Sequence, residues 1–109
     1  MPPPRIILAL TLRAAERAGL KLVEMKHVHR LVYLAKDELP DVYELFVFSE
    51  YYPYPWSYEV EEGLLSLMTD NYVVWIGEFR TYPKVDVLCK KEEETYERIW
   101  RAVSQFKEI

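Results

Sequence analysis

Cysteine, glycine and histidine are all scarce in this sequence of 109 residues. A single cysteine excludes any disulfide within the chain. The three glycines, Gly19, Gly63 and Gly77, are scattered, so no glycine-rich loop is present to cradle a phosphate. The two histidines, His27 and His29, are two residues apart, and a helix points side chains at that spacing away from each other. These shortages exclude a disulfide framework and a phosphate-binding loop, and they argue against a zinc site.

Long hydrophobic runs are also missing. The longest, such as Ile6 to Leu10 and Val73 to Ile76, are far too short to span a bilayer. The Met-Pro-Pro-Pro start has no basic, apolar and cleavage regions of the kind a signal peptide needs. Asn71 and Gln105 are the only side-chain amides, beside 29% charged residues, as is typical of heat-adapted proteins. We therefore expect a cytoplasmic protein that does not act at a membrane.

No pattern of polar residues predicts an active site. No nucleophile elbow surrounds any serine. The acidic groups, Glu59 with Glu61 and Glu62 and the run from Glu92 to Glu94, fall at expected helix starts, where carboxylates favour the helix dipole. We expect Cys89 to be an inert strand residue. The sequence thus predicts a protein that is not an enzyme and has no cofactor and no metal.

Hydrophobic residues are plentiful, at 50% of the chain with 15% aromatic. We expect one domain over residues 1–109, because two would each be too small to bury a core. The net charge of −4 is unevenly spread. Residues 1–36 hold seven basic and two acidic residues, a net +5, and residues 37–109 hold seven basic and sixteen acidic residues, a net −9. The N-terminal third can therefore carry a local basic surface.

Apolar spacing predicts four helices. The first, about Arg5 to Ala18 before Gly19, is apolar around most of its circumference, which favours burial on two sides and cover by a second subunit. The second covers about Leu22 to Glu38, and the third runs from the N-cap Ser57 to about Thr69. The fourth follows the acidic run and has a clean helical spacing of Tyr96, Ile99, Trp100, Val103 and Phe106.

Three segments predict strands. Residues 42–50 are rich in β-branched and aromatic types. Residues 72–79 and 82–90 predict a hairpin joined at Arg80 and Thr81, with Arg80 and Lys84 near its tip. The order is then helix, helix, strand, helix, β-hairpin, C-terminal helix. That order is typical of an α+β winged helix-turn-helix domain with the hairpin as its wing.

Residues 31–72 carry a recognisable outline. Leu31-Val32-Tyr33-Leu34-Ala35 precedes a strand, and a turn from Tyr52 to Glu59 leads into an amphipathic helix that exits at Asn71-Tyr72. This outline resembles small prokaryotic winged-helix proteins, among them the Panacea antitoxin-like domain and archaeal winged-helix regulators. The chain departs from them where Tyr52-Pro53 replaces Tyr-Gly-Pro and where Asn71-Tyr72 replaces Gly-Leu. The resemblance implies a winged-helix fold, with binding to DNA or to a toxin-like protein as an analogy.

Two surfaces are candidates for binding. The first lies on the second helix and the hairpin, where cations suit contacts with the phosphates of a nucleic acid. The alternative is an ordinary solvated helix face. The candidate residues for binding nucleic acid are Lys26, His29, Arg30, Tyr33, Arg80 and Lys84. The aromatic turn suits a protein interface, and the alternative is a rigid turn that caps the domain's own core; its residues are Tyr52, Tyr54, Trp56 and Tyr58.

The third helix weighs against DNA, because its outward residues are expected to include Glu59, Glu61, Glu62 and Ser66, and carboxylates repel phosphates. We expect a homodimeric regulator, built on the first or last helix, that binds double-stranded DNA through the second helix and the wing. The alternative is a module on the same scaffold that binds a protein partner and no DNA.

Overall fold

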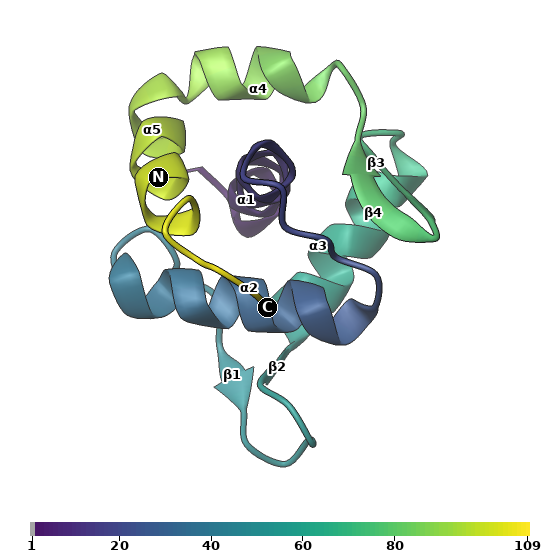
Figure 1. Cartoon of the computed structure of the whole chain (residues 1–109), viewed down its shortest axis with the longest axis vertical. Helices are drawn as coiled ribbons and strands as arrows, with labels where there is room; N and C mark the ends of the chain where they lie inside the picture. Colours follow the sequence, from purple (N-terminus) through teal and green to yellow (C-terminus); the bar gives the residue numbers. More distant parts are fainter. Residues whose placement is uncertain (1) are drawn as a thin grey trace.

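The computed structural model describes residues 2–109, which form five α-helices and two short antiparallel hairpins (Figure 1). The elements follow in the order α1 (Pro4–Arg17), α2 (Met25–Glu38), β1 (Phe48–Ser49), β2 (Trp56–Ser57), α3 (Tyr58–Thr69), β3 (Val73–Ile76), β4 (Glu78–Thr81), α4 (Val85–Lys91) and α5 (Glu93–Val103). The domain is therefore α+β, as the sequence predicts. None of the helices in residues 2–109 combines the length and the apolar character that crossing a membrane requires.

Helix α1 runs through the middle of the domain, and the other helices surround it (Figure 1). Pro4 begins the helix, where its missing N–H removes no helical hydrogen bond. Gly19 follows the helix with a φ of +78°, the left-handed conformation that ends many helices. Every residue from Ile7 to Leu12 is buried, because α3, α5, α4 and β4 of the same chain all pack on α1. The cover that the sequence led us to expect from a second subunit thus comes from within the chain.

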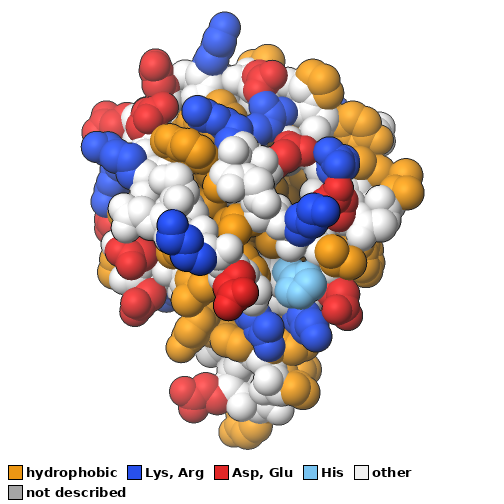
Figure 2. All heavy atoms as spheres, viewed as in Figure 1, with side chains coloured by type: hydrophobic (Ala, Val, Ile, Leu, Met, Phe, Trp, Pro, Cys, Tyr) orange, Lys and Arg blue, Asp and Glu red, His pale blue; other side chains and the backbone are white. Residues whose placement is uncertain are grey.

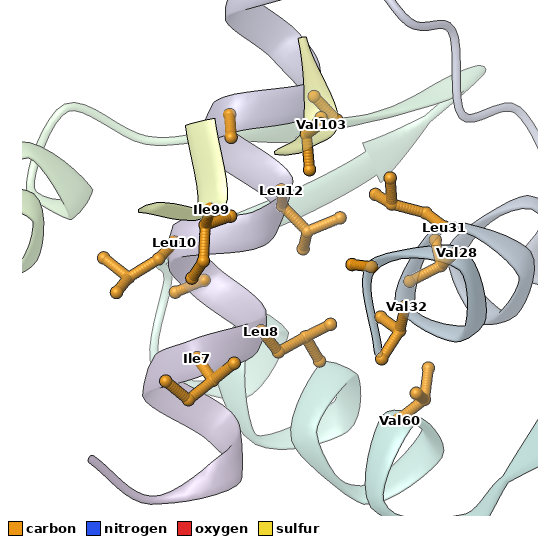
Figure 3. Packing of buried hydrophobic residues seen from close by; sticks show 14 of the residues in the cluster. Ile7, Leu8, Leu10, Leu12, Val28, Leu31, Val32, Val60, Ile99 and Val103 are labelled. Atoms are coloured by element: carbon orange, nitrogen blue, oxygen red, sulfur yellow. The ribbon is translucent and has the colours of Figure 1, made fainter. Parts of the chain in front are cut away.

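The core lies where α1 meets α2, α3 and α5. Figure 3 shows Leu8 and Leu12 of α1 pointing toward Val28 and Val32 of α2. Each such buried side chain stabilises the fold by about 1.5–3 kcal/mol. Helix α3 approaches α1 closely at Gly63, where an added Cβ atom would stand 2.9 Å from Cδ2 of Leu8.

Helix α2 begins later than predicted, because residues 20–24 are irregular and support the β3–β4 hairpin. The backbone N–H of Phe79 donates to the carbonyl of Leu22 (2.8 Å), and the Trp75 indole donates to the carbonyl of Val23 (2.9 Å). Glu24 then caps the helix through a reciprocal pair with His27, whose Nδ1 accepts the N–H of Glu24 (3.1 Å).

The strand predicted over residues 42–50 is wrong except for Phe48–Ser49. The N–H groups of Val42 and Tyr43 both donate to the carbonyl of Leu39, so the chain keeps turning after α2. Val42, Tyr43 and Phe46 are buried at a helix-like spacing. Tertiary burial, and not strand pairing, therefore accommodates these β-branched and aromatic side chains.

The β3–β4 hairpin lies earlier in the chain than predicted. Its strands pair from Val73 with Thr81 to Ile76 with Glu78, around Gly77 at a φ of +77°. A glycine adopts this left-handed conformation without steric cost, so the chain turns there and not at Arg80-Thr81. Arg80 consequently lies within β4 and not at the hairpin tip.

The strand predicted over residues 82–90 is also wrong. Pro83 interrupts regular pairing, and helix α4 begins at Val85. The alternation in the sequence is part of a helical spacing, in which Val85 is buried and Leu88 and Cys89 are half-buried. Lys84 precedes α4 and lies outside the hairpin.

Helices α3 and α5 confirm the predicted positions. Ser57 stands at the N-cap position of α3, as predicted. Its hydroxyl donates to Oε1 of Glu59 (3.1 Å) and makes no capping hydrogen bond with the helix backbone. Helix α5 follows the acidic run and buries Tyr96, Ile99 and Val103 as expected.

Candidate protein interface

The β1–β2 hairpin projects from the body of the domain beyond α2 (Figure 1). Its strands pair through Phe48 with Ser57 and Ser49 with Trp56. Residues 50–55 between the strands include three tyrosines and two prolines. The prolines fix φ and stiffen the connection. We call residues 48–57 the aromatic hairpin, and it contains three of the four residues predicted to form a protein interface.

His29 fastens the aromatic hairpin to the core. Its side chain is fully buried, so the prediction that it lies on an exposed basic face of α2 is wrong. Nδ1 accepts a hydrogen bond from the backbone N–H of Ser57 (3.1 Å), and Nε2 lies 2.9 Å from Oε2 of Glu61 in α3. Because an accepting Nδ1 carries no proton, the neutral ring donates from Nε2 to Glu61. Buried, and with both nitrogens occupied, His29 cannot contact a phosphate.

Three aromatic rings of the hairpin extend outward from His29. The ring centroids of Tyr54 and Trp56 lie 5.6 and 5.8 Å from the imidazole, and Tyr52 stacks on Trp56 at 4.6 Å. Aromatic pairs of this kind contribute about 0.5–1.5 kcal/mol each. Trp56 is half-buried, whereas Tyr52 remains 48% exposed. The inner rings therefore pack against the buried His29, and the outer ring leaves about half of its surface exposed.

Two carboxylates from the first turn of α3 hold the base of the aromatic hairpin. Oε1 of Glu59 accepts the backbone N–H of Val47 (2.8 Å) and the hydroxyl of Ser57. Oε2 of Glu61 accepts the hydrogen bond from Nε2–H of His29. Hydrogen bonds to charged groups contribute about 1.5–3 kcal/mol each. The prediction that both carboxylates face outward is therefore wrong, because both are half-buried in these contacts.

Exposed apolar side chains surround the aromatic hairpin. Tyr51 is 99% exposed at its tip. Figure 2 shows hydrophobic side chains gathered on the lobe at the bottom of the view, where the hairpin projects. Neighbouring apolar side chains that are about half exposed or more are those of Leu45, Val47 and Tyr58. Contiguous apolar patches are rare on protein surfaces away from interaction sites, so this face is a candidate interface.

Tyr58, the fourth predicted interface residue, lies apart from the ring stack at the start of α3. Its hydroxyl donates to a carboxylate oxygen of Glu62. This hydrogen bond raises the pKa of Tyr58 above its ordinary value. The structure thus brings Tyr52, Tyr54 and Trp56 together and leaves Tyr58 at the edge of the same surface.

Two of the predicted DNA-contacting cations form ion pairs within the chain. Nζ of Lys26 lies 3.7 Å from a carboxylate oxygen of Glu24, and the Arg80 guanidinium lies 2.5 Å from that of Glu78. Figure 2 shows Lys and Arg side chains interspersed with Asp and Glu across the face that carries α2. Mixed charge of this kind gives no strong field toward a phosphate backbone.

The other predicted contacts also have local roles. Lys84 lies over the ring of Tyr72, with Nζ 4.2 Å from its centroid. The Arg30 guanidinium is within 3.5 Å of the carbonyl of Ile109. Tyr33 packs edge-to-face on Phe48 at 5.3 Å and so belongs to the surface of the aromatic hairpin.

Neither metal chemistry nor thiol chemistry is indicated. Within residues 2–109, no group of three or more His, Cys, Asp or Glu side chains is arranged to hold a metal ion. Cys89 lies half-buried in α4 and not in a strand. Burial raises the pKa of its thiol, which lowers the fraction present as the reactive thiolate.

Sequence reasoning missed Ser57, Glu59 and Glu61 as the residues that hold the hairpin. A signal was available at His29, which directly follows the inward Val28 and stands three residues before Val32. That position borders the apolar stripe of α2, where a histidine is buried and needs partners.

Comparison with known proteins found no matching family model, no matching curated protein and no matching solved structure.

Proposed function

We propose that this protein is a non-catalytic interaction module whose protein partner binds the aromatic hairpin. One observation carries the proposal: the hairpin exposes Tyr51 and Tyr52 while His29, Glu59 and Glu61 hold its base rigid. A surface ordered before binding loses little conformational entropy on association. Tyrosines are enriched among the residues that dominate interface energies.

The charges near the hairpin favour a basic partner. Asp37, Glu44 and Glu50 are exposed around it. Complementary charge steers association and disfavours wrong partners. The proposed partner therefore presents an apolar contact surface bordered by Lys or Arg.

Site-specific photo-crosslinking in the cells that produce the protein tests this proposal. A benzophenone amino acid replaces Tyr51, and a matched variant carries it at Val87 in α4, which is also exposed at 62%. We expect one protein to crosslink at position 51 but not at position 87, and adding Tyr52→Ala to abolish the adduct. No adduct at position 51, or the same adducts at both positions, would contradict the proposal.

DNA binding is the second candidate, and the order of the elements favours it. Helices α2 and α3, with the β1–β2 hairpin between them, precede the β3–β4 hairpin, which matches the helix, strand, helix and wing order expected of a winged helix. On this winged-helix assignment, Lys26 and Arg30 contact phosphates from α2. Anisotropy measurements with mixed double-stranded DNA at two salt concentrations test it. Binding that weakens steeply with salt and is lost in Lys26→Glu/Arg30→Glu supports DNA recognition, and no binding at low salt refutes it.

A further inference from the structure

Two hollows flank a pair of rings where α2 meets the aromatic hairpin. Tyr33 and Phe48 form this pair, edge-to-face at an interplanar angle of 77°. One hollow lies among the pair, Tyr52 and Tyr54, and the other lies between the pair and Pro40. Because the hollows share Tyr33 and Phe48, they form one groove with the ring pair as a ridge. We call it the tyrosine groove.

The tyrosine groove offers hydrogen-bond donors. The hydroxyls of Tyr43, Tyr58 and Tyr96 are engaged with other side chains. Within residues 2–109, the hydroxyls of Tyr51, Tyr72 and Tyr82 outside the groove make no hydrogen bond, and neither do the groove hydroxyls of Tyr33, Tyr52 and Tyr54. Each is therefore free to donate to a carbonyl of a bound chain.

A chain in the polyproline II conformation suits this lining better than a β-strand does. A strand added to a hairpin needs a long free edge, and β1 and β2 are two residues each. A proline-rich chain has carbonyls without internal hydrogen bonds and few N–H groups that need acceptors. Residues three apart lie on the same face of a polyproline II helix, and their proline rings pack into hollows between aromatic side chains.

The charges of the groove add a second requirement. Asp37 lines one hollow and Glu50 the other, both exposed. Neither carboxylate has an ion pair in the described part of the chain. The Lys36 ammonium lines the same hollow as Asp37 and donates to the backbone carbonyl of Phe46, whereas the hollow that contains Glu50 has no cation in its lining. A basic residue in the ligand is the complement of these two carboxylates.

We propose that the tyrosine groove binds a proline-rich segment of a partner protein that carries Arg or Lys beside the prolines. This inference rests on the proposed function and specifies its partner. The groove is ordered in advance by the contacts of His29 and Glu59, and the ligand is stiff before it binds, so both sides lose little entropy.

The test uses the full chain and a fluorescein-labelled peptide of about six prolines flanked by arginines, in which the prolines alone extend ~19 Å at ~3.1 Å per residue. Two control peptides keep the length: one replaces the prolines by alternating Gly and Ser, and one replaces the arginines by glutamates. Fluorescence anisotropy measures affinity, and ¹H–¹⁵N NMR spectra locate the bound surface. We expect saturable binding of the proline–arginine peptide only, with shifts confined to the hairpin and α2.

Conservative variants separate recognition from folding. Tyr33→Phe and Tyr52→Phe keep the rings and remove one donor each, which we expect to weaken binding about two- to tenfold. Tyr52→Ala removes the exposed ring, and we expect a loss of at least about tenfold. Tyr82→Phe is the matched control, since Tyr82 is 38% exposed outside the groove, and its affinity should equal that of the wild type.

Each outcome decides the inference. Equal binding of the Gly–Ser peptide shows that charge alone acts and overturns the inference. An equal loss of affinity in Tyr82→Phe shows that the effect is not specific to the groove, which also overturns it. No peptide binding while position 51 still crosslinks to a partner overturns the proline-rich ligand and retains the interface. Failure of both experiments overturns the proposed function as well. Groove resonances that shift with protein concentration alone assign the groove to a second copy of the chain, which also overturns the inference.

Discussion

Replacing His29 by alanine tests the claim that one buried ring holds the aromatic hairpin to the domain. The substitution leaves the buried backbone N–H of Ser57 without its acceptor, at a cost of about 1–3 kcal/mol. It also removes ring contacts with Tyr54 and Trp56 and opens a cavity, which costs about 2 kcal/mol or more for a ring of this size. We expect a total loss of about 3–5 kcal/mol, a large share of the ~5–15 kcal/mol that stabilises a typical domain.

The matched control is His27→Ala, two residues earlier on the same helix. Nδ1 of His27 accepts the N–H groups of Val23 and Glu24 at 3.1 Å, so its loss removes a helix cap and costs about 1 kcal/mol. Urea unfolding followed by far-ultraviolet circular dichroism compares the two variants. With a slope of about 1–3 kcal/mol per molar urea, the His29→Ala midpoint should fall by about 1 M or more beyond that of His27→Ala.

Hydrogen exchange of the Ser57 amide locates the effect. The wild-type amide should be protected and should lose protection in His29→Ala but not in His27→Ala. Equal destabilisation by the two substitutions, with Ser57 protected in both, would refute the role assigned to His29.

Three further predictions concern the body of the domain. Gly63→Ala should lower the free energy of unfolding by about 1 kcal/mol in urea. Alanine favours the helix, but the new Cβ atom crowds the fully buried Leu8, and the cost of this crowding should exceed the gain in helix propensity. A more stable variant would contradict this packing. The Arg98 guanidinium holds the pKa of Asp41 below its ordinary value. The ion pair therefore stabilises the fold fully above the unfolded-state pKa of about 4. The difference in stability between the wild type and Arg98→Met should vanish as the pH falls through the lowered pKa of Asp41. Burial raises the pKa of Cys89, so iodoacetamide should alkylate the folded protein more slowly than the urea-unfolded chain near pH 8, and equal rates would contradict the burial.

The helical core could be predicted because its signal is local and periodic. The buried positions of α5, spaced from Tyr96 to Val103, repeat every three or four residues, and so do those of α3. The stop at Gly19 was also predictable, since it depends on the left-handed conformation of one residue. Each of these features is decided within a few residues of its own position.

The strands were less predictable, because β-branched and aromatic residues are equally suited to a buried turn. The residue types at Val42, Tyr43 and Phe46 favour a strand. In the structure, however, the hydroxyl of Tyr43 lies inside the core, 2.7 Å from the hydroxyl of Thr11 and hydrogen-bonded to it. The choice between turn and strand depends on whether a partner strand exists, and none does for this segment within residues 2–109. The sequence pattern carries no information on that point.

The uneven charge along the chain is partly offset by ion pairs across the fold. The net +5 of residues 1–36 suggested a basic surface, but Arg5 pairs with Asp70 and Arg13 with Asp86, so cations of the N-terminal third meet acids of the remainder. Spacing along the chain reports the average environment of a residue and not its partner across the fold.

The positions of the carboxylates bear on both proposed functions. The acidic start of α3 was an argument against DNA because carboxylates repel phosphates. Glu59 and Glu61 are in fact occupied by the base of the hairpin, so that repulsion is weaker than the sequence implies. The same occupation, however, orders the tyrosine groove, whose own carboxylates Asp37 and Glu50 remain exposed. The weaker repulsion adds no contact for DNA, whereas the ordered groove with its exposed carboxylates supports the proposal that a basic protein segment binds there.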